Sequence, residues 1–304
     1  MIHIALTIDC RFVRFCAVTM ASVMKNNAGR EITFHIVEDG SLQAEDKAVL
    51  QQMTTGSCCK TEFYSISDEE IKDFVLTWES HRLSKVVFYR CLLASVLPAS
   101  LSRVLYMDCD ILVLGPLDDL WNTDLDGYAL AAVPDDVIVN KERCERLHYD
   151  ASYNYFNGGV LLLNLDFWRQ NDVEEKCREY YKTYPQRIVY NDQDLLNGLL
   201  HRETKLLGMT WNLQEGAYRH KTIRFYTKDL LLHPMILHYS ARKPWQYHCM
   251  HPLRHLFFDY QDLTRWKGCN PLNSRFNRLH RFFHLLPYTL RLKKNKYVNP
   301  NKME

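Results

Sequence analysis

The sequence predicts an α/β protein in which a mostly parallel β-sheet is flanked by helices. Apolar stretches of strand length alternate along the chain with stretches whose apolar residues recur at helical spacing. The strand-length stretches are almost continuously apolar, which is typical of strands that are buried on both faces. The chain has 304 residues, of which 47% are hydrophobic, and this is enough to bury a substantial core.

The first half of the chain shows this alternation from its beginning. A strand, a helix and a second strand are expected at residues 3–9, 15–26 and 32–39, and together they complete a βαβ unit. The pattern then continues with a helix at 46–53, a strand at 61–66 and a helix at 68–76. Alternation of this kind indicates a parallel sheet covered by helices.

The chain continues with a strongly apolar helix at residues 85–98, which Pro98 stops, and an apolar strand over 103–115. The remaining elements are expected at 128–133, 159–164 and 235–240 (strands), and after Asp166 and around 192–200 (helices). The sequence shows no repeat, low-complexity tract or clear linker before about residue 250. We therefore assign residues 1–250 to one α/β domain and residues 251–304 to a C-terminal extension.

The C-terminal extension carries an excess of positive charge. Residues 250–304 contain 11 Lys and Arg against 3 Asp and Glu, although the whole chain has a net charge of only +2. The stretch 274–286 predicts a basic amphipathic helix, which suits the surface of an anionic membrane. The alternative is a helix packed on the core with a solvated charged face. No nucleic-acid-binding motif accompanies the charge, so a nucleic-acid partner is not expected.

The N-terminal sequence MIHIALTIDCRF lacks the basic start, long apolar run and cleavage site of a secretory signal. No stretch reaches the roughly 18 apolar residues of a membrane-spanning helix. The ten cysteines are scattered without any CxxC pair, and several lie inside apolar segments. We expect reduced, mostly buried thiols in a cytoplasmic protein.

The stretch 103–114, RVLYMDCDILVL, places Asp108 and Asp110 one residue apart in otherwise apolar sequence. If this stretch continues as a strand, the two side chains project from the same face. Carboxylates so placed repel each other unless a cation lies between them or one is protonated. Their hard oxygen atoms suit Mg²⁺ or Mn²⁺. The alternatives are a turn at a strand end or two capping aspartates, because a three-residue pattern recurs by chance.

Polar side chains also follow three other predicted strands: Asp9, Asp135 with Asp136, and His238. Ligands of open α/β sheets collect beyond the carboxyl ends of the strands. We therefore expect these side chains to form one site with the aspartate pair.

An aspartate pair after an apolar strand is also similar to the nucleophile loop of haloacid-dehalogenase-like phosphatases. In that family a Thr or Val normally stands two positions after the second aspartate, whereas this chain has Leu112. The pair also lies a third of the way along the chain, behind two or more predicted strands. These departures weigh against a phosphatase.

The metal-binding segment around the aspartate pair and five further motifs in order resemble glycosyltransferase family 8, the retaining nucleotide-sugar transferases that include bacterial lipopolysaccharide galactosyl- and glucosyltransferases. They begin with IALTIDCRF, KVVFYRCLLASVLP and the metal-binding segment RVLYMDCDILVLGPLDDLWNTDL, followed by NYFNGGVLLLNLDFWR, YNDQDLLNGLL and ILHYSARKPW. The resemblance extends over about residues 1–248. It implies the GT-A type of fold, with a Rossmann-like sheet, and a UDP-sugar as the donor substrate.

The resemblance also implies where the donor binds. The opening segment, with Thr7, Asp9 and Arg11, would lie beside the nucleotide, and Arg90 would face the diphosphate. The donor sugar would lie near Asn157 and Gly158. From the residues alone, Asp9 is equally suited to cap the following helix. Arg90 is equally suited to a salt bridge within the protein, because an unpaired buried guanidinium is costly.

The metal ligands implied by the resemblance are Asp108, Asp110 and His238, and Lys243 would bind phosphate. Imidazole together with carboxylates favours Mn²⁺, with Mg²⁺ as the second choice. The last motif departs from the family, which usually has a glycine two residues after the His-aromatic pair and a lysine six residues after the histidine. Here Ser240-Ala241 replaces the glycine step and Lys243 comes one residue early, so Arg242 is an alternative cation.

Retention of anomeric configuration is likewise implied by the family. Gln193 would lie near the anomeric carbon, and Asp192 and Asp135 would bind sugar hydroxyls. Because a neutral amide is a poor nucleophile, we favour attack from the face that the diphosphate leaves. A covalent intermediate on Asp192 or Asp194 is the alternative, and helix capping is their ordinary structural role.

The expected function is metal-dependent transfer of a hexose, galactose or glucose, from a UDP-sugar to a saccharide or glycolipid acceptor. Lipopolysaccharide or another cell-surface glycan is the expected product, made at the cytoplasmic face of the membrane. The phosphatase and a catalytically silent nucleotide-sugar-binding relative remain the alternatives.

Overall fold

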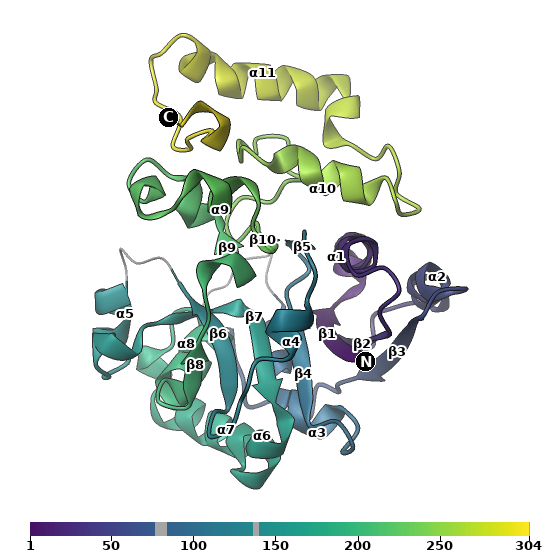
Figure 1. Ribbon diagram of the computed structural model, residues 1–304, viewed down its shortest axis with the longest axis vertical. Helices are drawn as coiled ribbons and strands as arrows, with labels where there is room; N and C mark the ends of the chain where they lie inside the picture. The colour runs from purple at the N-terminus through teal and green to yellow at the C-terminus, as the bar shows by residue number, and fades with distance from the viewer. Residues whose placement is uncertain (77–83, 136–139, 304) are drawn as a thin grey trace.

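The computed structural model describes residues 1–76, 84–135 and 140–303. Its main feature is a seven-stranded sheet in the order β3-β2-β1-β4-β7-β6-β8 (Figure 1). The strands are β1 (Ile2–Ile8), β2 (Ile32–Glu38), β3 (Cys59–Ser65), β4 (Arg103–Met107), β6 (Leu130–Pro134), β7 (Phe156–Asn164) and β8 (Thr204–Leu206). Strand β7 runs antiparallel to β4 and β6, and the other pairs are parallel. The predicted α/β class with a mostly parallel sheet is confirmed.

The sheet is buried on both faces by helices. On one face lie η2 (Lys85–Leu92), α3 (Leu93–Val96), α6 (Leu165–Gln170), α7 (Val173–Thr183) and α8 (Asn191–Leu200). On the other lie α1 (Val13–Asn26), α2 (Ala44–Thr54) and α4 (Asp118–Trp121). Successive side chains of β1 point to opposite faces of the sheet: Ile4 and Leu6 pack in the core with α1, whereas Ala5 packs in the core with η2. This explains why the strands have almost continuously apolar sequences.

Two predicted helices have a different structure. Residues 68–73 form successive turns and 74–76 have no regular structure, and Asp73 pairs with Arg178 and Lys182 of α7. These tertiary contacts override the local helical pattern. The predicted helix 85–98 is a 3₁₀ helix followed by the single α-helical turn of α3. The adjacent β-branched Val86 and Val87 disfavour an α-helix at its start.

A second, three-stranded sheet lies beside the first, in the order β5-β10-β9. It contains β5 (Ile111–Val113), β9 (Leu213–Gln214) and β10 (Ile236–His238). The predicted continuous strand 103–115 is therefore wrong, because the chain leaves the large sheet after Met107 and joins the small one at Ile111. The predicted strand 235–240 is confirmed only over its central residues.

The other helices lie at the edges of these sheets and beyond them. They are α5 (Asn140–Arg146), α9 (Lys228–Leu232), α10 (Arg254–Gln261), α11 (Arg275–Thr289), and the short 3₁₀ turns η1 (Cys10–Phe12), η3 (Ala151–Tyr153), η4 (Pro185–Arg187), η5 (Met209–Trp211), η6 (Glu215–Tyr218), η7 (Ile223–Phe225), η8 (Pro271–Asn273) and η9 (Pro300–Lys302). A third apolar core, with Tyr218, Tyr239 and Phe257, joins β10 and α9 to the C-terminal segments.

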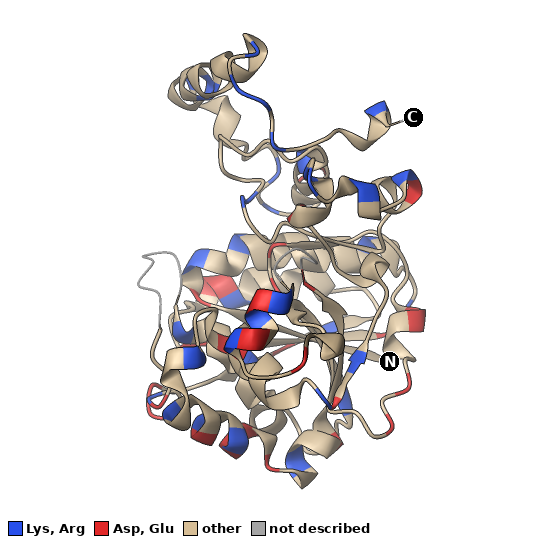
Figure 2. Ribbon diagram, turned by 90° about the vertical axis from the view of Figure 1, so that its left-hand side faces the viewer, with Lys and Arg blue, Asp and Glu red and all other residues tan. Residues whose placement is uncertain are grey.

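The C-terminal extension leaves the α/β body and returns to it. Helix α10 packs on α1, whereas α11 stands away from the body and has no buried residue (Figures 1 and 2). The chain then comes back, where Tyr297 forms a β-bridge with Arg219 and the Val298 N–H donates to the carbonyl of Tyr218 at 2.8 Å. Helix α11 also continues through Pro287, beyond its predicted end. Within the described residues, no helix combines the length and apolarity that crossing a membrane requires.

Candidate functional site

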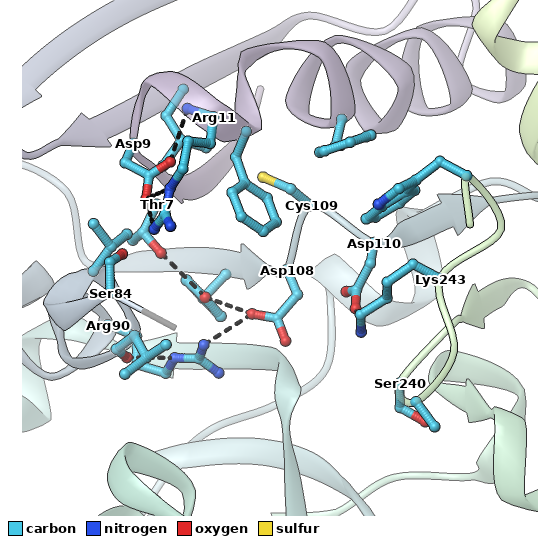
Figure 3. A pocket seen from close by; sticks show the side chains of 18 of the residues that line it. Thr7, Asp9, Arg11, Ser84, Arg90, Asp108, Cys109, Asp110, Ser240 and Lys243 are labelled. Carbon is cyan, nitrogen blue, oxygen red and sulfur yellow. Dashed lines mark hydrogen bonds and ion pairs between the residues drawn. The ribbon is translucent and has the colours of Figure 1, made fainter. Parts of the chain in front are cut away.

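A cavity of about 760 Å³ opens at the carboxyl ends of β1 and β4 (Figure 3). Most of the residues predicted to bind the donor and the metal line it: Thr7, Asp9, Arg11, Arg90, Asp108, Asp110 and Lys243. A second cavity of about 420 Å³ shares Arg90 and Asp108 with the first. It is lined by the remaining predicted donor-sugar side chains, Asp135, Asn157, Asp192 and Gln193. The structure thus brings the sequence-predicted residues together in two adjoining cavities.

Asp108 and Asp110 converge because the chain turns between the two sheets. The Asp108 N–H still donates to the Gly159 carbonyl of β7 at 2.9 Å, which extends the pairing of the large sheet. The carbonyl of Asp110 already accepts from the Tyr239 N–H at 3.0 Å, beside the small sheet. The expected strand alternation is therefore not the cause of their convergence. Residue Asp136, also predicted to be near the site, lies outside the described residues.

The two aspartates and His238 form a candidate metal centre. Their ligand atoms all lie within 4.8 Å of one another. Nε2 of His238 lies 3.3 Å from Oδ1 of Asp110 and 3.9 Å from Oδ2 of Asp108. His238 and Asp110 are buried, whereas the side chain of Asp108 is 26% exposed and open to the cavity. Two carboxylates and an imidazole are ligands that can hold a divalent metal ion.

The state of Asp110 fits a bound cation. Burial alone would raise the pKa of Asp110, but the Lys243 ammonium outweighs it and holds this pKa well below its usual range. Lys243 donates to Oδ2 of Asp110, whereas Oδ1 is buried and, among the described residues, has no hydrogen-bond partner. A buried carboxylate oxygen without a partner is costly. A divalent cation would satisfy this oxygen, so the residues present fit the metal.

Arg90 connects the two cavities. Its guanidinium donates to Oδ1 of Asp108 at 2.9 Å, pairs with Oδ2 of Asp192 at 3.0 Å, and donates to the Gly158 carbonyl. It also lies 4.4 Å from the ring centre of Tyr106, in a cation–π contact. The salt bridge that the sequence left open for Arg90 is therefore present. Burial raises the pKa of Asp192 to about 7, even though the nearby Arg90 charge lowers it.

At the end of the cavity formed by β1, Asp9 is engaged within the protein. Its side chain caps η1 through the Arg11 N–H and also binds the Arg11 guanidinium at 2.6 Å (Figure 3). The capping role considered for Asp9 is thus observed. Thr7 contacts the hydroxyl of Tyr106 at 3.3 Å. Trp245 stacks on Phe15 at 3.7 Å between ring centres and adds an aromatic wall.

The second cavity contains a connected set of amides. Oε1 of Gln193 accepts from the Gly158 N–H at 3.0 Å and from Nδ2 of Asn157 at 3.2 Å. Nε2 of Gln193 donates to Asp135 at 2.7 Å, and Asp135 also pairs with Arg143 at 2.6 Å. A Cβ added at Gly158 would lie 3.1 Å from Nη1 of Arg90, so the glycine allows the guanidinium its close approach to this backbone.

Asp194 has a structural role. It is fully buried, pairs with Arg146, and accepts from the backbone N–H groups of Val189 and Tyr190 at the start of α8. It does not line either cavity described above. The N-cap of α8 is Tyr190, so Asp194 supports the start of this helix from its first turn, which favours a structural role over that of a nucleophile.

The loop that carries Lys243 is braced by the C-terminal segment. The fully buried carboxylate of Glu215 accepts from the Arg242 N–H and from the side chains of Lys296 and Tyr297. These hydrogen bonds lower the pKa of Glu215 although burial opposes them. Sequence reasoning missed Glu215, and it missed Asn212, which binds His238. Neither lies in a motif, and only the tertiary structure reveals their partners.

Comparison with known proteins identifies the family. Residues 3–249 match the model of Glycosyl transferase family 8. General stress protein A of Bacillus subtilis is 27% identical over 87% of this chain and 94% of its own length. A lipopolysaccharide 1,2-glucosyltransferase of Escherichia coli is 26% identical over 86% of this chain and 78% of its own. The lipopolysaccharide 1,3-galactosyltransferase of Salmonella typhimurium is 25% identical over 92% of this chain and 85% of its own length.

Solved structures show the same fold. The galactosyltransferase LgtC, solved with donor and acceptor sugar analogues, superposes with a TM-score of 0.76 at 24% identity. The match covers 88% of this chain and 99% of LgtC, so the GT-A type of fold is confirmed. The glycosyltransferase GlyE of Streptococcus pneumoniae has a TM-score of 0.66 over the whole of this chain and 67% of its own, at 19% identity. The chain is a glycosyltransferase and belongs to glycosyl transferase family 8.

Proposed function

We propose that this protein is a metal-dependent, retaining hexosyltransferase that uses a UDP-sugar as donor. The observation that carries the proposal is the group of Asp108, Asp110 and His238, of which Asp108 lines both cavities and Asp110 lines the larger one. A diphosphate in the large cavity would place its charge between this group and Lys243. A hexose in the smaller cavity would then lie against Gln193, at the position of the bond to be broken.

The protein's own residues would prepare the leaving group. Asp108, Asp110 and His238 would hold a divalent cation, which acts as a Lewis acid that stabilises negative charge on a departing diphosphate. Lys243 adds a second positive charge beside Asp110 from the loop after β10. Arg90 holds Asp108 and Asp192 in place, so that these carboxylates keep their orientation as charge develops.

The geometry of Gln193 supports attack from the face that the diphosphate leaves. Its Oε1 already accepts two hydrogen bonds, from the Gly158 N–H and the Asn157 side chain. An amide oxygen whose two lone pairs are so engaged is a poorer nucleophile than a free amide, which is itself weak. We therefore favour a role in which the amide dipole of Gln193 stabilises positive charge at the sugar ring.

The donor and acceptor follow the relatives. The names of two relatives specify glucosyl and galactosyl transfer to lipopolysaccharide, so we propose glucose or galactose as the transferred hexose. The acceptor would be a saccharide or glycolipid of the cell surface, bound at the open side of the smaller cavity. Arg143 and Arg219 are among the residues that line this cavity.

A membrane-surface role for α11 completes the proposal. Its apolar side chains are exposed, with Phe276 at 67%, Phe283 at 60% and Leu279 at 54%. Basic residues surround them, and α11 projects away from the body (Figure 2). A helix of this kind inserts its apolar face among lipid headgroups and attracts anionic lipids through Lys and Arg. We propose peripheral attachment at the cytoplasmic face of the membrane.

A screen of UDP-sugars for Mn²⁺-dependent release of UDP tests this proposal. We expect UDP release with UDP-glucose or UDP-galactose, loss of release in a chelator, and recovery when Mn²⁺ is restored. Full activity after exhaustive chelation would overturn metal dependence. Tight binding of UDP and Mn²⁺ without transfer to any acceptor would indicate a catalytically silent relative. The phosphatase alternative predicts release of phosphate from monoesters, and the family match does not favour it.

A further inference from the structure

A chain of buried amides runs from the donor-sugar residues to the candidate metal ligand His238. Gln193 contacts Asn157, Nδ2 of Asn212 donates to Oδ1 of Asn157 at 2.9 Å, and Oδ1 of Asn212 lies 3.0 Å from Nδ1 of His238. At the other end, Nε2 of Gln193 donates to Asp135. The metal centre and the proposed sugar site are therefore parts of one hydrogen-bonded network.

Backbone groups fix the direction of every amide in this chain. The Gly159 N–H lies 3.0 Å from one end of the Asn157 amide. Because an N–H group can only donate, this end must be the carbonyl oxygen Oδ1. The Gly158 N–H identifies Oε1 of Gln193 in the same way, also at 3.0 Å. The NH₂ group of Gln193 then faces Asp135, a carboxylate that can only accept. The orientations are thus determined independently at two points.

This direction carries through to the histidine. Oδ1 of Asn157 accepts, so the group of Asn212 that faces it must be the NH₂ group. The carbonyl oxygen of Asn212 then faces His238, and Nδ1 of His238 must carry a hydrogen to bond with it. In neutral His238, Nε2 therefore bears a lone pair, and it points at the unpartnered Oδ1 of Asp110, 3.3 Å away.

Burial makes this network hard to rearrange. Asn212 is fully buried, and His238 and Asn157 are 3% and 6% exposed. Rotating any one amide would place like groups opposite each other, where little water is available to compensate. The ring of His238 is also confined by Gly159, since a Cβ added there would lie 2.4 Å from its Cε1 atom.

We propose that Asn212 is a positioning residue, which holds His238 in the tautomer whose Nε2 lone pair faces Asp108 and Asp110. The amide chain thereby fixes two orientations together: the metal-binding nitrogen of His238 and the carboxamide of Gln193. This inference rests on the proposed function for its metal, whereas the tautomer itself is a property of the protein alone.

The first test reads the tautomer directly. In protein labelled with ¹⁵N-histidine, freed of metal and titrated to a pH at which His238 is neutral, the ring nitrogen shifts of His238 should show hydrogen on Nδ1 and a bare Nε2. The assignment can be made by comparison with a His238→Gln variant. A spectrum with hydrogen on Nε2 and a bare Nδ1 would overturn the proposal.

The second test measures Mn²⁺ binding by calorimetry, with no substrate present. Asn212→Leu removes the acceptor from Nδ1, and we expect affinity for Mn²⁺ to fall about 10–100-fold, as for other changes of groups that orient metal ligands. Asn212→Asp keeps an acceptor at this position and should retain Mn²⁺ affinity within about threefold, a range well below that loss.

The matched control is Asn27→Leu. Like Asn212, Asn27 has a buried amide that makes two hydrogen bonds, but its partners are backbone groups and it lines neither cavity described above. Equal Mn²⁺ affinity in Asn212→Leu and Asn27→Leu would overturn the proposal. If Asn212→Leu does not fold, Asn212→Asp decides instead: a loss of Mn²⁺ affinity of about 10-fold or more in this variant would overturn the proposal. If the wild-type protein binds no Mn²⁺, the metal of the proposed function fails, and the ¹⁵N spectrum still decides the tautomer.

Discussion

Lys243 donates a hydrogen bond to Asp110, so a cation of the protein itself neutralises one oxygen of this buried carboxylate. The other oxygen faces His238 and has no hydrogen-bond partner among the described residues. Asp110 can therefore bind the Lys243 ammonium through one oxygen and a metal ion through the other. This arrangement explains why a single carboxylate should control both metal binding and turnover.

Asp110→Asn should abolish transferase activity and weaken Mn²⁺ binding. The loss of Mn²⁺ affinity should exceed the roughly 100-fold loss that follows substitution of a residue that only orients a metal ligand. The substitution keeps the shape of the side chain but removes its charge. Binding is measured by calorimetry and turnover by UDP release. The matched control is Asp126→Asn, in the exposed second DxD pattern Asp124-Leu125-Asp126, which should behave as wild type. Near-normal turnover in Asp110→Asn would remove this residue from the mechanism.

Lys243→Met tests which cation of the altered loop acts at the site. Lys243 lines the large cavity and binds Asp110, whereas Arg242 is exposed and its backbone N–H binds Glu215. We expect Lys243→Met to lower kcat and to destabilise the metal-free protein by about 3 kcal/mol, because a buried carboxylate loses its partner. Arg242→Met should change neither. Urea unfolding and UDP release measure the two effects, and a larger loss in Arg242→Met would reverse the assignment.

Gly159→Ala should displace the metal ligand His238 without any change of charge. The added Cβ would lie 2.4 Å from Cε1 and 2.8 Å from Nδ1 of His238, so the ring must move. We expect loss of Mn²⁺ binding and of turnover, with the circular dichroism spectrum retained. Gly208→Ala is the control, since its added Cβ would meet nothing within 4 Å. Normal Mn²⁺ affinity in Gly159→Ala would show that His238 is not required as a ligand.

His251 should make the protein less stable in mild acid. It is buried against Tyr218 and Tyr239, and burial lowers its pKa to about 3. Between pH 6.5 and 3 the unfolded chain binds a proton that the folded protein does not, so the free energy of unfolding falls as pH falls. Its contribution between pH 6.5 and 5 is about 2 kcal/mol.

Urea unfolding at pH 7.5 and pH 5 measures this effect. His251→Phe should show a smaller loss of stability between the two values than wild type, whatever its stability at pH 7.5. The exposed His233 provides the control, since His233→Phe should keep the wild-type difference. Equal differences in wild type and His251→Phe would exclude His251 as the source.

The apolar face of α11 should control binding to anionic vesicles. Replacing Phe276 and Phe283 by Ser removes two exposed aromatic side chains from this helix. We expect flotation with phosphatidylglycerol vesicles to be lost, with UDP release in solution unchanged, because α11 stands away from both cavities. Phe225→Ser, at another exposed aromatic residue, should leave flotation intact. Undiminished flotation of the double variant would refute the membrane role.

The sequence allowed the large sheet to be predicted because its strands are buried on both faces. Their apolar stretches, such as that of β2, would be costly in any exposed conformation. The residues at strand ends could be predicted for a related reason, since carboxyl ends meet at one edge of a sheet. The residues predicted to bind the donor sugar were found from motifs, because each motif is a short stretch of consecutive sequence.

Contacts between distant segments could not be predicted in this way. Asp73 and its partners on α7 turned a predicted helix into successive turns. Asn212 carries no local signal, because its role depends on His238 and on Asn157 of another sheet. The turn at Asp108–Asp110 has the same origin, because β5 pairs with β10 more than a hundred residues later.

The bond network of Glu215 has a consequence for biosynthesis. Lys243 emerges from the ribosome well before Lys296 and Tyr297, which brace its loop through Glu215. A nascent chain that stalls between these points would display every motif of the family and yet leave Glu215 without two of its donors. Synthesis of residues 296 and 297 thus completes the brace of the Lys243 loop, and a shorter translation product would lack two of the hydrogen bonds that hold Glu215 in place.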